Sequence, residues 1–124
     1  MWFGDLVTMK WWNGIWLNEA FATFMATKAV DVLIKIGKRW VQFGIERSAA
    51  FDVDSLHSTR PIEFEVISPD DASAMFDLLT YEKGGAVLRM LEQYVGEDQF
   101  RDGIRSYLKN MNTQILKLPI YGIV

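Results

Sequence analysis

The aromatic N-terminal segment, residues 2–21, constrains the fold of this chain most strongly. Four of the five tryptophans lie within the first sixteen residues, and one carboxylate, Glu19, stands among apolar neighbours. An unpaired charge in apolar surroundings is costly, so such a carboxylate needs a cation or a proton as its partner. A fold that buries this segment must therefore supply that partner to Glu19.

Residues 13–24 have the pattern of a helix with one buried face. Their apolar side chains recur at spacings of three and four, the period of an amphipathic helix. The stripe consists of Trp16, Leu17, Ala20, Phe21 and Phe24. Glu19 projects beside it, where a ligand could meet a groove, and Asn13 is a residue type that caps helices. Residues 1–8 indicate the end of another apolar helix, stopping near Gly4.

The remaining sequence predicts further helices, so the expected fold class is mainly α. A helix from about Lys38 is expected to carry four apolar residues inward. These are Trp40, Val41, Ile45 and Ala49. Ser68 and Pro69 are typical of a helix start, and the helix they begin should run to about Phe76. Apolar spacing then predicts a helix closed by Gly96 and a last helix ending near Met111.

The connector between the helix from about Lys38 and the helix that starts at Ser68 contains Arg60-Pro61. Proline biases Arg60 to extended geometry and disfavours a helix there. Residues 62–66 alternate between apolar and polar, which predicts a short extended run. His57 is the only histidine of the chain. Because no second histidine follows at helical spacing, a structural or surface role is expected for it.

Composition narrows the function classes. The 124 residues are 50% hydrophobic, enough for a single domain with a core. With 13 basic and 16 acidic residues the net charge is −3, and no basic stripe is present, so nucleic acid is not an expected partner. The absence of cysteine excludes disulfides and thiolate metal sites, and a cytoplasmic location is expected. Asp5 and Lys10 interrupt the apolar N-terminus, so neither a signal peptide nor a membrane helix is expected.

Two motifs resemble the zinc aminopeptidases of the aminopeptidase N and puromycin-sensitive aminopeptidase type. In that family a zinc helix, His-Glu-x-x-His, runs into Trp-Phe-Gly-Asn/Asp-Leu-Val-Thr and then Trp-Leu-Asn-Glu, which match residues 2–8 and 16–19. The glutamate of the last motif is the family's third zinc ligand, a role the resemblance gives to Glu19. The Tyr-Glu-Lys-Gly at residues 81–84 resembles the motif that begins with the family's catalytic tyrosine, which maps to Tyr81.

The resemblance implies the helical lobe of a thermolysin-like zinc metallopeptidase catalytic domain, here incomplete. It also implies one zinc ion and a peptide substrate for the complete enzyme. The family's spacing between its second zinc histidine and the ligand glutamate corresponds to residues 1–18, so the zinc helix is expected to end just before Met1. The sequence contains neither His-Glu-x-x-His nor the family's Gly-Ala-Met-Glu-Asn segment, which binds the substrate amine. The chain alone is therefore expected to be an inactive fragment of an aminopeptidase.

A different class of function stays open beside this one, a non-catalytic helical scaffold or interaction protein derived from the same family. In either case the N-terminal aromatics are expected to be exposed and to promote self-association. Gly84 and Gly85 are poor helix formers, which suggests close backbone packing beneath the site.

The resemblance divides the chain at residue 111. Residues 1–111 are expected to form the partial catalytic domain, and residues 112–124 a divergent apolar tail. Two accounts of the tail are open, a change or truncation of the reading frame and a hydrophobic docking segment.

Overall fold

A computed structural model describes residues 2–34, 38–111 and 115–116. Within them lie the helices α1 (Ile15–Leu33), α2 (Arg39–Asp54), α3 (Pro69–Ala74), α4 (Gly84–Val95) and α5 (Glu97–Met111). Two short helical turns, η1 (Trp12–Gly14) and η2 (Leu79–Lys83), lead directly into α1 and α4. The prediction of a mainly α fold is confirmed.

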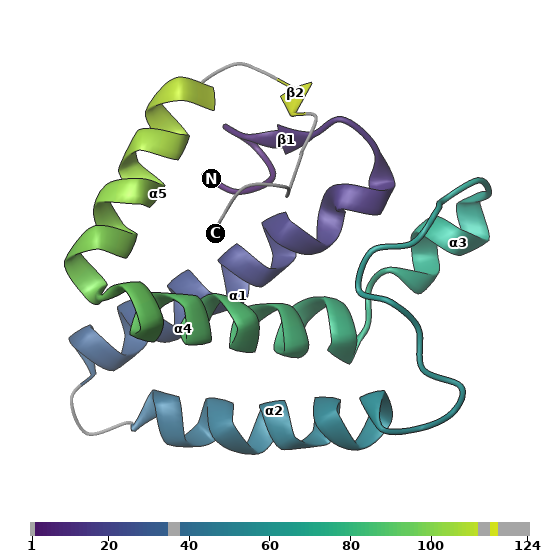
Figure 1. The fold of residues 1–124 in the computed structure, drawn as a ribbon, viewed down its shortest axis with the longest axis horizontal. Helices are drawn as coiled ribbons and strands as arrows, with labels where there is room; N and C mark the ends of the chain where they lie inside the picture. The colour runs from purple at the N-terminus through teal and green to yellow at the C-terminus, as the bar shows by residue number, and fades with distance from the viewer. Residues whose placement is uncertain (1, 35–37, 112–114, 117–124) are drawn as a thin grey trace.

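Helix α1 lies at the centre of the arrangement. It contacts α4, α2 and the turn η2, and α5 packs against α4 after the chain reverses at Gly96 (Figure 1). Gly96 has a φ of 94°, a left-handed backbone that favours glycine, as its predicted place at the helix end requires. The predicted stripe on α1 is buried, and its residue Phe24 meets the rings of Trp40 and Phe100 at centroid distances of 5.8 and 5.4 Å.

The N-terminal segment is not the helix end that the sequence predicted. The amide of Gly4 donates to the carbonyl of Val7 at 2.9 Å, and the amide of Val7 donates to the carbonyl of Trp2 at 3.0 Å, which closes a turn. Gly4 takes a φ of 105° within it. Glycine was therefore needed for a turn rather than for a helix end.

The turn leads into a two-stranded sheet. Strand β1 (Thr8–Met9) pairs in parallel with β2 (Ile115–Leu116), with Thr8 opposite Ile115. Of the predicted tail, residues 112–124, only this strand lies within the described residues.

Asn13 does not cap α1, which corrects the sequence prediction. Gly14 occupies the capping position, and the side-chain amide of Asn13 donates instead to the carboxylate of Glu63 at 3.2 Å. Glu63 lies in the connector, 50 residues further along the chain, so local sequence spacing could not predict this hydrogen bond. The connector itself shows the expected alternation, with Val66 buried and Glu63 and Glu65 exposed.

The inner face of α2 was predicted correctly at Trp40, which packs against the core, and wrongly at the other three positions. Val41 and Ile45 are 62% and 63% exposed, and Ala49 is exposed too, whereas Phe43 and Ala50 are buried. Phe43 points to the start of α4, where its ring meets the backbone of Gly85. The helix is rotated so that this ring fills the space left by the glycine.

The remaining helix predictions agree with the structure. Ser68 caps α3 through a capping box with Asp71, although the helix ends at Ala74 rather than near Phe76. Helix α5 buries Phe100 and ends at Met111 as expected. The sequence also predicts that Gly37 ends the segment that includes Val30 to Ile36. This glycine lies outside the described residues, and α1 is described to Leu33.

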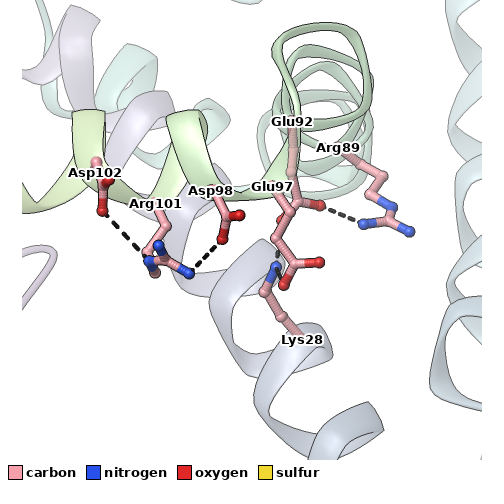
Figure 2. A network of polar contacts seen from close by, with 7 residues as sticks. All are labelled: Lys28, Arg89, Glu92, Glu97, Asp98, Arg101 and Asp102. Atoms are coloured by element: carbon pink, nitrogen blue, oxygen red, sulfur yellow. Dashed lines mark hydrogen bonds and ion pairs between the residues drawn. The ribbon is translucent and has the colours of Figure 1, made fainter.

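The C-terminal end of α4 carries a buried carboxylate, Glu92, only 2% exposed. It forms ion pairs with Lys28 of α1 and with Arg89, and Lys28 also bonds Glu97 at 2.8 Å (Figure 2). Burial by itself lowers the pKa of Lys28, but its hydrogen bonds to Glu92 and Glu97 outweigh burial and raise that pKa above its usual value. The guanidinium of Arg89 lies 4.1 Å from the ring centroid of Trp40, so the network also reaches α2.

None of the described helices is long and apolar enough to cross a membrane.

Candidate functional site

Glu19 lies on α1, beside the buried stripe, as the sequence predicted. It sits between Asn18 and Ala20, which are both buried, and is itself half-buried. The neighbours on α1 therefore turn inward while the carboxylate remains at the rim of the core. A half-buried carboxylate keeps one side open to a ligand.

Tyr81 lies on η2, a single π-helical turn immediately before α4. The sequence did not predict this turn. Its first amides are held by a side chain, because the carboxylate of Asp77 accepts hydrogen bonds from the amides of Leu79 at 2.9 Å and Thr80 at 3.0 Å. Such turns are rare and occur frequently at functional sites.

The structure brings Glu19 and Tyr81 together. Burial raises the pKa of the Tyr81 hydroxyl, and the negative charge of Glu19 and a hydrogen bond to its carboxylate raise that pKa further. The phenol therefore stays protonated at neutral pH and can act as a hydrogen-bond donor. A carboxylate and a phenolic donor from two different elements thus meet at one place.

Close packing between α1 and α4 places the two side chains. A Cβ atom added to Gly84 would lie 2.7 Å from Cβ of Ala20, the residue after Glu19. A Cβ added to Gly85 would lie 3.3 Å from the ring of Phe43 and from the methyl group of Thr23. The predicted close backbone packing at these glycines is confirmed, and it involves Ala20, next to Glu19, and Gly84, three residues after Tyr81.

Two polar groups near the site were not singled out by sequence reasoning. Asn18 is 1% exposed and donates to the carbonyl of Val7 at 3.3 Å, while its carbonyl oxygen Oδ1 is buried without a partner among the described residues. Glu82 follows Tyr81 and has one buried carboxylate oxygen in the same condition. Burial and the charge of Glu46 raise the pKa of Glu82. The sequence signal for each was its place inside one of the two motifs, at residues 16–19 and 81–84.

The described residues do not gather three side chains of the His, Cys, Asp and Glu types in positions that could hold a metal ion. His57, the one histidine, is exposed in the turn after α2, as expected for a surface residue. Glu19 has the chemistry of a zinc ligand, an anionic oxygen with one open side. The described part of the chain thus fits zinc as the provider of one ligand and not of a complete site.

The mainly helical fold, with Glu19 and Tyr81 close together, agrees with the metallopeptidase domain that the two motifs suggest. Residues 1–118 match the family described as Peptidase family M1 domain, and the chain belongs to this family.

Relatives with curated names align over most of the chain. It is 53% identical over 112 residues to a tricorn protease-interacting factor F2 from Thermoplasma volcanium, which covers 87% of this chain. It is 52% identical over 108 residues to a probable aminopeptidase 2 from Sulfurisphaera tokodaii, covering 86% of this chain. A leucyl aminopeptidase from Saccharolobus solfataricus is 47% identical over 112 residues, covering 90% of this chain. The alignments span 14% of the length of each of these relatives. The chain thus corresponds to a short part of the length of these relatives.

Proposed function

We propose that the chain forms part of the active site of a zinc-dependent aminopeptidase, with Glu19 as a zinc ligand and Tyr81 as a catalytic hydrogen-bond donor. The contact between the Glu19 carboxylate and the Tyr81 hydroxyl carries the proposal. The names of the relatives from Sulfurisphaera and Saccharolobus support peptides with a free N-terminus as the substrate.

Glu19 would hold the metal through its half-buried carboxylate. Bound zinc activates water and polarises the scissile carbonyl. The nitrogen ligands and the general base would come from a His-Glu-x-x-His helix, which the 124 residues do not contain. These residues by themselves are accordingly expected not to release a chromophore from aminoacyl anilides with zinc added.

Tyr81 would act on the substrate oxygen. Its raised pKa keeps the proton on the phenol, so the hydroxyl can donate to negative charge that develops on the carbonyl oxygen during attack. The carboxylate of Glu19 lies close enough to raise the pKa of the Tyr81 hydroxyl, so the donor would stand beside the proposed metal ligand. The bond to substrate would form mainly in the transition state, and its loss should therefore lower kcat.

A chimera tests both roles. Residues 1–111 would replace the matching segment of the Saccharolobus leucyl aminopeptidase, and zinc content and hydrolysis of leucyl anilide would be measured. Tyr81→Phe should lower kcat by about 10²- to 10³-fold with little change in KM and in zinc content. Glu19→Gln should lower zinc content, and excess zinc should partly restore activity.

Matched controls separate these roles from general damage. Tyr94→Phe changes an exposed tyrosine on α4, and Glu65→Gln changes an exposed carboxylate of the connector, so neither should alter kcat or zinc content. An active chimera in which Tyr81→Phe raises KM at constant kcat would make the catalytic assignment wrong.

An interaction role is the second candidate, favoured by exposed aromatic side chains. A groove of about 450 Å³ is lined in part by Trp11, Trp12, Ile67 and Phe76, all of which are exposed. One relative is named as an interacting factor of another protease. Within this proposal the chain self-associates through Trp2, Trp11 and Trp12, and sedimentation of the chain should show the association weakened by Trp11→Ser.

The two candidate functions predict different results for the chimera. An active chimera that fails with Tyr81→Phe favours the enzyme, whereas a folded, zinc-free and inactive chimera favours the interaction role. The proposal also places the protein in the cytoplasm, as expected from the cysteine-free sequence, and cell fractionation would test this location.

A further inference from the structure

The connector between α2 and α3 contains an arginine that binds the turn bearing Tyr81. The guanidinium of Arg60 forks onto the carboxylate of Asp77, with Nε 3.2 Å from Oδ2 and Nη2 2.7 Å from Oδ1. Nη2 also donates to the hydroxyl of Thr80 at 3.1 Å. Thr80 is fully buried and immediately precedes Tyr81.

Asp77 transmits this contact to the backbone of η2. Its carboxylate accepts from the amides of Leu79 and Thr80, and its backbone carbonyl accepts from the amide of Tyr81 at 3.2 Å. The Oδ1 atom therefore receives both the arginine and the first amides of the turn. A change in Arg60 reaches Tyr81 through one carboxylate and one buried hydroxyl.

The arginine itself is fixed by its own segment. Its Nη1 atom donates to the carbonyl of Pro61 at 2.9 Å and to that of Ile62 at 3.3 Å, and its Cζ atom lies 4.8 Å from the ring centroid of Phe64. Ile62 in turn packs at the other end of η2, where its Cδ1 atom would lie 3.4 Å from a Cβ on Gly84. The connector thus holds the turn at both of its ends.

We propose that Arg60 is a positioning residue for Tyr81: its fork onto Asp77 and Thr80 fixes the π-helical turn so that the tyrosine hydroxyl meets Glu19. The inference rests on the proposed catalytic role of Tyr81. The side chains of Arg60 and Asp77 are 21% and 39% exposed, and ion pairs so accessible to water add little to global stability. The effect of the fork is on the local geometry of η2, because the two parallel hydrogen bonds of a planar guanidinium fix the orientation of Asp77 as well as its distance.

Hydrogen exchange on the chain itself tests the coupling. In Arg60→Met the amides of Leu79, Thr80 and Tyr81 should exchange about tenfold faster or more, the scale expected for losing a hydrogen bond to a charged group. Amides of α1 and α5 should keep their rates. Arg101→Met is the matched control, since it removes an arginine that contacts Asp98 and Asp102 on exposed α5, and it should leave η2 unchanged.

Two further variants separate geometry from charge. Arg60→Lys keeps the positive charge but cannot form the fork, so its exchange at η2 should resemble that of Arg60→Met. Thr80→Val removes only the buried hydroxyl contact at nearly constant volume, so it tests the coupling if the arginine variants do not fold. Unchanged exchange at η2 in Thr80→Val and in every folded Arg60 variant would overturn the inference, as would full retention of protection in Arg60→Lys.

Kinetics in the chimera complete the test. Arg60→Met should lower kcat by about 10- to 100-fold with KM within about twofold, because a small misplacement of a catalytic group affects the transition state most. Faster exchange at η2 with unchanged kcat would overturn the positioning role. If the chimera carrying the unaltered segment is inactive, the proposed function fails, whereas hydrogen exchange still decides whether Arg60 fixes the turn.

Discussion

The two ends of α4 are attached to α1 in different ways. At its first residue, Gly84 lies so close to Ala20 that a methyl group would stand 2.7 Å from Cβ of Ala20. Near its last residue, the buried carboxylate of Glu92 is ion-paired with Lys28 and Arg89 (Figure 2). Close steric packing therefore fixes the first end, and ion pairs fix the second.

The difference matters because only the shape-determined end adjoins Glu19 and Tyr81. Backbone packing without a side chain has almost no freedom to shift, since neighbouring atoms already touch. A lysine with a long flexible stem can follow small movements of its partner. The chain therefore places its least adjustable contact beneath the candidate site and its more adjustable one at the far end of the helix.

The largest expected effect comes from leaving the buried charge without partners. Lys28→Met combined with Arg89→Met would strand Glu92, and breaking a buried ion pair in this way costs about 3–5 kcal/mol of the free energy of unfolding. Urea unfolding followed by circular dichroism measures the loss.

Adding Glu92→Leu to that double variant should restore most of the stability, because apolar residues of similar size commonly replace a buried ion pair without loss. If the double variant is as stable as the unaltered chain, charge does not hold this end of α4.

The second effect tests the end that shape fixes. Gly84→Ala inserts a methyl group against Ala20 and should lower the free energy of unfolding by about 1–3 kcal/mol, as overpacking does. Gly103→Ala is the matched control, because that position in α5 has no heavy atom within 4 Å of an added Cβ. The control should stabilise the chain by up to about 1 kcal/mol through helix propensity. Equal effects at the two glycines would show that the contact with Ala20 is not tight.

The sequence predicted what local spacing determines. The stripe on α1, the cap of α3 at Ser68 and the end of α4 at Gly96 each follow from residue types a few positions apart, and the structure agrees. Gly84 and Gly85 were also interpreted correctly as close-packed, because glycine is a poor helix former.

The wrong predictions at α2 and Asn13 and the missed turn at Tyr81 share a dependence on distant partners, whereas the turn at Gly4 is closed by local hydrogen bonds. The contact between Phe43 and Gly85 determines which face of α2 is buried. Asn13 binds Glu63 instead of capping α1. The π-helical turn at Tyr81 depends on Asp77 and on Arg60 from the connector, so periodicity could not reveal it. The roles of Glu19 and Tyr81 came from resemblance, and they stay predictions that the chimera would test.

The smallest expected effect is a pH dependence confined to the charged end of α4. The hydrogen bond and the charge of Lys28 hold the pKa of Glu97 below its usual value, so Glu97 contributes stability above its unfolded pKa and loses it as pH falls through the folded pKa. Glu97→Gln should slightly lower the urea midpoint at about pH 7, and the difference from the unaltered chain should shrink toward about pH 3, below the ordinary range of a glutamate pKa.

Gly84→Ala provides the contrast, because steric overlap does not depend on protonation and its cost should be the same at both pH values. A Glu97→Gln difference that persists unchanged in acid would mean that the ion pair with Lys28 contributes nothing to holding α5 and α4 on α1. The comparison between a charge-fixed and a shape-fixed end of α4 would then rest on Glu92 alone.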